Sequence, residues 1–480
     1  MKRYYAALAL FFATALACCS IEAEIKLPSF ITDNMVVQNN SKLTLTGNTE
    51  SGKTVEVIPG WDGKTYRGKT DDKGRFSISI PTPASGGPYD LTVKSGDVTK
   101  TLYNILSGEV WLCSGQSNME FPLNGNWASV MDRDIVVATA NHPDIRLLQI
   151  KHKTAFTPQD DCDVNMGGWA ECTPASVANF SAIAYLFAQE IHGKLKVPVG
   201  VIDATWGGTP AEAWTSLGGI EKIEDFEKES DVLKSHAEGK KLMMKEYYTS
   251  HYPTVLYNAM IHPLSTMPVK GVLWYQGCAN VGRAGQYSKL FKTLIRDWRE
   301  TWKDNLPFYF VQLAGFRKQM NCQPDSEWAL LREAQADALE LDNTAMAVAA
   351  DIGNPVDIHP RNKQEVGRRL ALIALNRNYG YPEVDTAPVC KEMVQRNGRL
   401  ILKFDGDLYP TSVALTGFII AGDDGKFSPA CGKLIDSRTI ELSASGISNP
   451  TKARYGWADY PDGNLYGSTG LPIAPFRTDK

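Results

Sequence analysis

The sequence predicts an α/β fold in which a parallel sheet, covered on both faces, is flanked by two β-rich regions. Between residues 105 and 380, short strands that are apolar throughout alternate with helical stretches, as in a buried parallel sheet. Residues 24–104 and 381–480 instead alternate apolar with polar side chains between turn signals, as antiparallel strands do. We therefore expect an N-terminal β-sandwich (residues 24–104), a central α/β domain (residues 105–380) and a C-terminal β-rich region (residues 381–480).

Composition narrows the range of partners. The 480 residues include 50 Lys and Arg against 54 Asp and Glu, a formal charge of −4, which is typical of a globular protein. Nucleic acid is not an expected partner, because phosphate binding requires clustered basic residues and the chain has no such run. Neither an HExxH pair nor a CxxC pair is present, so no metal and no other cofactor is expected.

The first 19 residues resemble an export signal. Lys2 and Arg3 precede an apolar run over residues 4–17 and a group of small residues. The run is shorter than the roughly 20 residues that a bilayer-spanning helix needs, which favours a cleaved signal peptide. We expect an exported protein, periplasmic or secreted. An acyl anchor at Cys18 or Cys19, as in a bacterial lipoprotein, is the alternative.

The other seven cysteines cannot all pair within one chain, because their number is odd. Cys162 and Cys172 lie close enough in the sequence for a disulfide, and export would permit one, but spacing alone does not establish the pair.

The predicted strands of the N-terminal sandwich are separated by turns rich in Asp and Gly. They are Val55–Ile58, Phe76–Ile80 and Tyr89–Val93. In the central domain, the strongest strand predictions are Glu109–Leu112, Val199–Ile202, Gly271–Trp274, Pro307–Gln312 and Ala345–Ala349. Helices are expected over Ala182–Gly193, Gln286–Trp302 and Glu327–Leu341.

Chemically useful groups follow four of these strands, and the carboxyl ends of parallel strands meet at the edge where ligands bind. A Gly-flanked hydroxyl, Ser117, follows the first strand. The pair Gly207 and Gly208 follows the second and leaves main-chain N–H groups unshielded, while Asn280 after the third supplies an amide. A fourth loop carries His359. Together these groups would provide a nucleophile, an oxyanion hole and a general base.

The chain resembles the sialate O-acetylesterase branch of the SGNH hydrolases, which are carbohydrate esterases. The similarity extends over nearly the whole sequence after residue 24 and rests on the combination of several motifs. These motifs are Gly115-Gln116-Ser117-Asn118-Met119, Gly207–Trp214, Trp274-Tyr275-Gln276-Gly277, Ile358–Arg368, Arg454–Asp459 and Pro475–Thr478.

The resemblance implies a three-layer α/β/α flavodoxin-like domain that removes O-acetyl groups from sugars without a metal. Matched position by position, Ser117 is the nucleophile and donates its own N–H to the oxyanion. Gly207 or Gly208 and Asn280 complete the oxyanion hole, and His359 is the base. Asp357 is the nearest candidate for the acid that orients the imidazole, with Asp351 or a main-chain carbonyl as the alternatives. Gln116, Trp274 and Gln276 are candidate substrate contacts.

Position 278 departs from the family pattern. Cys278 stands where the resembling enzymes usually have glutamate after WYQG. We expect this difference to alter the surroundings of the site rather than its chemistry. A catalytic role for the thiol is disfavoured, because no histidine lies near Cys278 in the sequence and Ser117 has the better context.

The expected reaction is deacetylation of an O-acetylated sugar or glycan through a serine acyl-enzyme, with O-acetylated sialic acid as the leading substrate. Acetylated xylan or xyloglucan oligosaccharides are the alternative within the esterases. A carbohydrate-binding protein without activity is the alternative from another class, and it would leave the catalytic motifs without a purpose.

Overall fold

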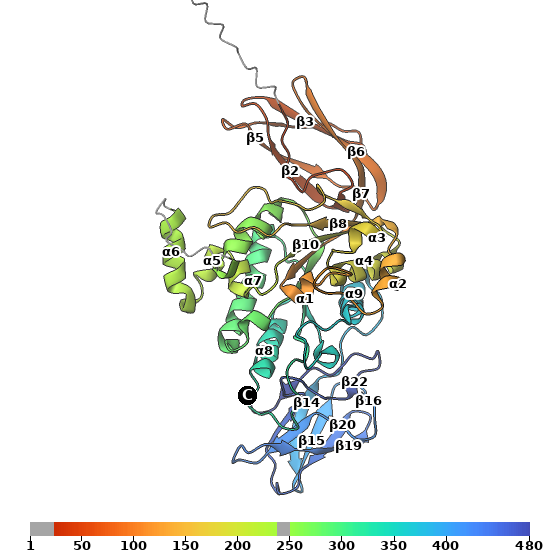
Figure 1. The fold of residues 1–480 in the computed structure, drawn as a ribbon, viewed down its shortest axis with the longest axis vertical. Coiled ribbons are helices and arrows are strands. Elements are labelled where there is room, and N and C mark those ends of the chain that lie inside the picture. Colours follow the sequence, from red (N-terminus) through yellow and green to blue (C-terminus); the bar gives the residue numbers. More distant parts are fainter. Residues whose placement is uncertain (1–23, 238–249) are drawn as a thin grey trace, which may run out of the picture.

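The computed structural model describes residues 24–237 and 250–480, arranged as three parts along the long axis of the molecule (Figure 1). A β domain lies at one end, an α/β domain in the middle and a second β region at the other end. The predicted signal peptide, with Cys18 and Cys19, lies outside the described residues.

The N-terminal domain is a β structure whose strands pair mainly antiparallel, as its alternating pattern predicts, although its first strand pairs in parallel. Its strands are β1 (Val36–Gln38), β2 (Lys42–Asn48), β3 (Thr54–Pro59), β4 (Tyr66–Lys69), β5 (Arg75–Pro81) and β6 (Gly86–Ser95). β2 pairs with β5, and β3 pairs with both β4 and β6. Alternate side chains of β5 are buried and exposed, so one face of each sheet packs into the core.

One strand connects this domain to the next. β7 (Val98–Gly115) is 18 residues long and runs through the predicted boundary at residue 104 without a break. Its first half pairs antiparallel with β6, and its second half lies between β10 (Val199–Thr205) and β11 (Gly271–Tyr275) in the central sheet. Hence no flexible linker separates the two domains.

The central sheet has the order β13-β12-β11-β7-β10-β8-β9, and only the edge strand β9 is antiparallel. The remaining strands are β8 (His142–Gln149), β9 (Ala170–Cys172), β12 (Phe308–Val311) and β13 (Thr344–Ala347). The chain turns to one side of β7 for β8 and β10 and to the other side for β11, β12 and β13. Ser117 therefore follows the strand at which the direction of winding changes, where ligands bind in such sheets.

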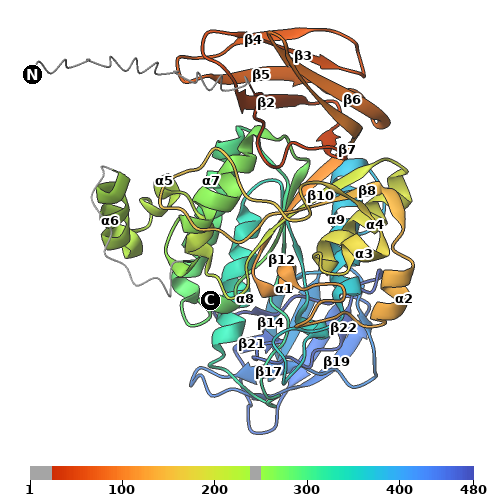
Figure 2. The same ribbon diagram turned by 45° about the horizontal axis from the view of Figure 1, so that its top comes forward.

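Helices cover both faces of this sheet, as the apolar strands predict (Figures 1 and 2). α4 (Ala182–Leu195) and α9 (Lys363–Tyr379) pack together on one face, while α7 (Ala284–Trp302) and α8 (Glu327–Ala336) pack together on the other. The other α-helices are α1 (Ser117–Glu120), α2 (Arg133–Ala138), α3 (Pro174–Val177), α5 (Leu217–Ile220) and α6 (Glu227–Ala237). Single helical turns are η1 (Ala211–Trp214), η2 (Glu224–Phe226), η4 (Tyr257–Ile261), η5 (His262–Thr266), η6 (Cys278–Asn280), η7 (Asp337–Glu340) and η8 (Ala350–Ile352).

The C-terminal region is β-rich, as expected, with its own apolar core. Its main sheet has the order β14-β15-β20-β19, and a second has the order β18-β17-β21-β23. The strands are β14 (Cys390–Arg396), β15 (Arg399–Phe404), β16 (Tyr409–Pro410), β17 (Phe418–Ala421), β18 (Ser428–Pro429), β19 (Cys431–Asp436), β20 (Thr439–Ser443), β21 (Lys452–Tyr455), β22 (Leu465–Tyr466) and β23 (Phe476–Arg477).

A buried arginine joins this region to the α/β domain. The guanidinium of Arg332, on α8, donates to the carbonyls of Leu313 and Ala314 and also to those of Ala458 and Asp459 near the end of the chain. Arg332 has no accessible surface. Because four carbonyls hold one desolvated cation, the two regions meet at a fixed geometry.

Cys162 and Cys172 are both buried free thiols, so the structure contains no disulfide between them. Across residues 24–237 and 250–480, no helix combines the length and the apolar character required to cross a bilayer.

Candidate active site

Ser117 lies at the first position of the short helix α1, directly after the carboxyl end of β7. Gly115 makes the turn: its φ is +133°, and a Cβ there would lie 2.3 Å from the carbonyl oxygen of Tyr275. Only glycine tolerates both conditions. The main-chain N–H of Ser117 has no acceptor within its own helix, because first-turn N–H groups have none, so it is available to a ligand.

The structure brings Ser117 and His359 together from positions 242 residues apart. Ser117 Oγ lies 2.8 Å from His359 Nε2. The other ring nitrogen faces Asp357, which assigns the acceptor role to Nε2 and makes the serine hydroxyl the donor. Both residues keep accessible surface, about 29% for the His359 side chain. This is the arrangement of a nucleophile and its general base.

Asp357 is the carboxylate that approaches the imidazole. Its Oδ1 lies 3.6 Å from His359 Nδ1 and accepts a 2.9 Å hydrogen bond from the main-chain N–H of His359. The side chain of Asp357 is about half exposed. Its contact with the ring is therefore a long, solvent-screened ion pair, weaker than the buried hydrogen bond of a serine-protease triad.

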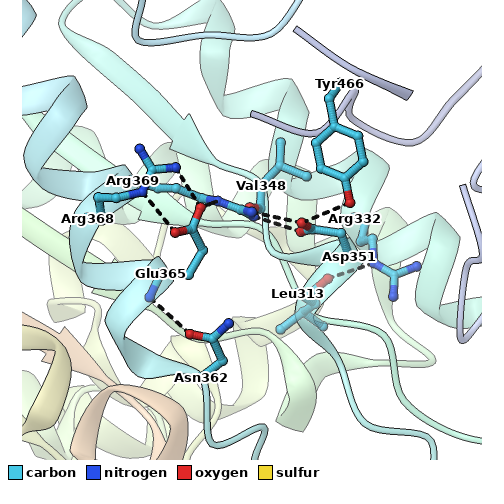
Figure 3. Close-up of polar contacts among 9 residues, drawn as sticks. All are labelled: Leu313, Arg332, Val348, Asp351, Asn362, Glu365, Arg368, Arg369 and Tyr466. Carbon is cyan, nitrogen blue, oxygen red and sulfur yellow. Dashed lines mark hydrogen bonds and ion pairs between the residues drawn. The ribbon is translucent and has the colours of Figure 1, made fainter. Parts of the chain in front are cut away.

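Asp351 is occupied elsewhere. Both of its carboxylate oxygens accept hydrogen bonds from Arg369 on α9, at 2.7 and 2.8 Å, and Tyr466 of the C-terminal region approaches at 3.5 Å (Figure 3). Arg369 also donates to Glu365. Asp351 thus fixes the loop before His359 to α9, and Figure 3 shows its carboxylate between the guanidinium of Arg369 and the hydroxyl of Tyr466.

The oxyanion-hole glycines lie beside the nucleophile. A Cβ on Gly207 would be 3.2 Å from the Cβ of Ser117, so the loop after β10 packs directly against it. The N–H of Gly207, however, donates to Glu120 at 2.5 Å. Gly208 has a φ of +75° and open space at its Cβ position. Of the two expected donors, Gly208 is the one that this arrangement leaves free.

Asn280 points into the protein instead of toward the serine. It has no accessible surface, its amide donates to Glu212 and its oxygen accepts from Gln276 and from the N–H of Ala211. These bonds tie the loop after β11 to η1. The structure therefore does not place Asn280 where its amide would contact an acyl oxygen.

The three expected substrate contacts are also interior groups. Gln116 is 3% exposed and accepts from the N–H groups of Gly277 and Ala279. Trp274 and Gln276 have no accessible surface. Their positions beside strand ends predict access to a ligand, but their side chains are buried. We correct their role to positioning the loops around Ser117.

Two residues near the dyad, Glu120 and His152, were missed from the sequence. Glu120 is three residues after Ser117 on the same helix, and residues at this spacing share a helix face. Its carboxylate binds the N–H of Gly207 and, at 3.1 Å, the imidazole of His152. His152 stacks on Trp206 with ring centroids 4.4 Å apart. Burial alone would lower the pKa of His152, but the hydrogen bond and charge of Glu120 outweigh burial and raise the pKa.

Lys363 is a third missed residue and is buried near the dyad. It has no accessible surface, and its Nζ donates to Asn118 Oδ1 at 2.5 Å. Asn118 in turn donates to the carbonyl of Ile358 at 3.0 Å. The residue after Ser117 is thereby bonded to the residue before His359. Burial lowers the pKa of Lys363 to about 7.

Cys278 is not placed as a nucleophile. Burial raises the pKa of its thiol to about 12, so the thiolate is scarcely populated near neutral pH. Within the described residues no group of three His, Cys, Asp or Glu side chains is arranged to hold a metal ion.

A serine bonded to an imidazole at the carboxyl edge of a flavodoxin-like sheet defines a serine ester hydrolase of the SGNH type. Residues 107–376 match the family described as carbohydrate esterase, sialic acid-specific acetylesterase. This match covers more than half of the chain. The protein therefore belongs to the sialic acid-specific acetylesterase family of carbohydrate esterases, and the predicted three-layer fold with flanking β elements is confirmed.

Similar proteins agree with this assignment. The chain is 28% identical to sialate O-acetylesterase from Rattus norvegicus, with 94% of each chain covered, and 28% identical to the Homo sapiens enzyme, with 94% and 92% covered. The crystal structure of a carbohydrate acetylesterase from Xanthomonas citri is 36% identical, with a TM-score of 0.85, and the alignment covers 95% of this chain and all of that one.

A first prediction concerns the pH dependence that His359 imposes. Burial and the nearby Lys363 lower the pKa of His359, whereas Asp357 raises it. The base is active when neutral, so kcat/KM rises with pH through this pKa. In Asp357→Asn the favourable charge is lost and the rising limb moves to lower pH. The rate at the plateau falls by less than about ten-fold, since an exposed ion pair contributes about 1 kcal/mol or less.

Asp351→Asn is the matched control. It weakens the Arg369 contact and lowers the thermal unfolding midpoint, but leaves the rising limb in place. The opposite result would identify Asp351 as the acid that orients the imidazole. In that case Asp351→Asn would shift the rising part of the pH profile of kcat/KM and Asp357→Asn would not.

A second prediction concerns Lys363→Met. The substitution removes the donor to Asn118, so the Ser117–His359 geometry loosens and kcat falls on the order of ten- to a hundred-fold. The free energy of unfolding at neutral pH changes by no more than about 2 kcal/mol, because the loss of the buried Asn118 hydrogen bond opposes the gain from removing a buried amine. In the parent protein, the free energy of unfolding rises with pH between about 7 and 10, because in this range Lys363 holds a proton in the unfolded chain and has released it in the folded one. The variant has no such lysine and loses this rise.

Kinetics and urea unfolding at several pH values measure both effects. Lys391→Met, at a lysine whose side chain is 61% exposed, is the control and changes neither quantity. A variant at position 363 with full activity would show that the Asn118 contact does not position the dyad.

Proposed function

We propose that this protein is a carbohydrate O-acetylesterase that uses Ser117 as its nucleophile, with O-acetylated sialic acid as the leading substrate. The observation that carries the proposal is the 2.8 Å contact between Ser117 Oγ and His359 Nε2 at an accessible sheet edge. The family description and the names of the mammalian relatives support the sugar and the ester.

The geometry supports a two-step acyl transfer. His359 accepts the hydroxyl proton while Ser117 Oγ attacks the acetyl carbon. The N–H groups of Ser117 and Gly208 face the resulting oxyanion, and one such donor is worth roughly 3 kcal/mol of barrier. As the C–O bond breaks, His359 returns the proton to the sugar oxygen. Water then attacks the acetyl-enzyme with His359 again as base.

Charged side chains around the dyad support two candidate classes of sugar, one acidic and one neutral. Arg133 and Arg361 line a hollow of about 570 Å³ together with Ser129, Asp132, Asp134 and Ile135. Arg133 pairs there with Asp134 and Arg361 donates to the carbonyls of Ser129 and Val130, so a sialic acid carboxylate would bind the remaining N–H groups of the two guanidiniums. Glu120 and Asp357, by contrast, place two carboxylates next to Ser117 and His359, which suits a neutral sugar. A neutral acetylated oligosaccharide, such as one from xylan or xyloglucan, is therefore the second candidate.

The nucleophile is tested with Ser117→Ala. Turnover of p-nitrophenyl acetate is expected to fall by about 10³-fold or more while the fold is kept, because no other group replaces Oγ. Ser114→Ala is a matched control on the preceding strand β7, since Ser114 Oγ is buried and donates to the carbonyl of Ala204. The assignment fails if Ser117→Ala cleaves the ester at the parent rate.

The substrate is tested by acetate release from 9-O-acetylated sialic acid and from acetylated xylo-oligosaccharides at equal concentration. We expect the higher kcat/KM for the sialic acid ester. A clear preference for the xylo-oligosaccharide would transfer the assignment to the second candidate. Sugar binding by a protein whose Ser117 is not labelled by a fluorophosphonate would instead support a non-catalytic lectin.

We also propose that residues 1–19 are a cleaved signal peptide and that the enzyme acts on glycans outside the cytoplasm. The charged start, apolar run and small residues of this segment support the proposal. The mass of the mature protein distinguishes simple cleavage from acylation at Cys18 or Cys19.

A further inference from the structure

The chain after α1 forms a short hairpin that presents one tryptophan beside the dyad. We call residues 121–131 the Trp127 hairpin. Its tip closes with a bond from the N–H of Gly125 to the carbonyl of Ala128, and a bridge joins Asn124 to Ser129. Trp127 lies at this tip.

The hairpin is held on two sides. Toward α4, the N–H groups of Leu123 and Asn124 donate to the carbonyls of Phe180 and Ala178. On the other side, Arg361 donates to the carbonyls of Ser129 and Val130, and its own carbonyl accepts from the N–H of Met131. Arg361 is two residues after His359. The position of the hairpin is thus coupled to the position of the catalytic imidazole.

Trp127 is exposed where it touches that imidazole. Its ring centroid lies 5.4 Å from that of His359 and 5.5 Å from that of Phe121, both edge to face. Yet 52% of its surface is accessible, and among the eleven tryptophans, all of which lie in the described residues, it is the only exposed one. An indole fixed by a rigid hairpin and left open to solvent offers a flat apolar surface to a ligand.

The reaction determines which part of the substrate meets this surface. The carbonyl oxygen of the ester must face the N–H groups of Ser117 and Gly208. The leaving oxygen must lie within hydrogen-bonding reach of His359 Nε2, because His359 protonates it. The sugar attached to that oxygen therefore projects toward the imidazole and the indole beyond it, and the acetyl methyl group projects away.

Given the proposed esterase function, on which this inference rests, we infer that Trp127 forms the subsite for the sugar that leaves, with the C–H face of a pyranose ring stacked on the indole. Trp127 is a specificity residue that acts on acylation. Deacylation does not involve it, because the sugar has departed and the same acetyl-enzyme is formed from every acetate ester.

The test compares esters that share the acetyl group and differ in the alcohol. The kcat/KM values of 9-O-acetylated sialic acid and of acetylated xylo-oligosaccharides are each divided by that of ethyl acetate, whose alcohol has no ring. In Trp127→Ala this ratio falls by about ten-fold or more for whichever sugar ester the parent cleaves, chiefly through a higher KM. Trp127→Phe retains a ring and most of the ratio.

Tyr103→Ala is the matched control, because Tyr103 is 56% exposed on the N-terminal part of β7, away from the dyad, and its loss leaves the ratio unchanged. Ethyl acetate turnover by Trp127→Ala in the same preparation reports that the variant is folded. An unchanged ratio in Trp127→Ala overturns the inference while the esterase function stands. If the parent cleaves ethyl acetate but neither sugar ester, the proposed function itself fails.

Discussion

Strand β7 is the constraint on which the rest of the molecule depends. It pairs with β6 and β1 in its first part and with β10 and β11 in its second, and it ends at the residue before the Gln116–Ser117 turn. Main-chain hydrogen bonds along both edges of β7 fix the point at which the chain leaves the central sheet. The nucleophile is therefore placed by backbone geometry, and the side chains around it have only to orient it.

The orientation comes from a polar layer just below the surface. Asn118, Lys363 and the carbonyl of Ile358 connect the helix that carries the serine to the loop that carries the histidine. Gln116 holds the loop after β11 through two N–H groups. Each group is buried and hydrogen-bonded, which is the condition under which polar groups are retained in an interior. A small displacement of any of these buried groups would change the 2.8 Å distance between Ser117 Oγ and His359 Nε2.

Much of this could be predicted from the sequence. The strand-helix alternation and the groups at strand ends predicted the sheet, the serine and the histidine, because both patterns are local and periodic. Side-chain direction at a strand end is not local, and Trp274 and Gln276 were therefore assigned to the substrate although both are interior. Trp127 and His152 lie in loops, where residues follow neither the helix nor the strand period, so the sequence pattern does not show that they lie near the dyad. Glu120 could have been predicted, because it is three residues after Ser117 and a short helix there places both side chains on one face.

The buried guanidinium of Arg332 also has a consequence for biosynthesis. Two of its four carbonyl partners, Ala458 and Asp459, are about a hundred residues downstream of the histidine loop. During translation the chain must be synthesised beyond residue 459 before this guanidinium can bind all four carbonyls. A nascent chain that already contains both Ser117 and His359 thus still lacks two of the partners of Arg332, and folding around α8 is completed only after the segment with Ala458 and Asp459 has been made.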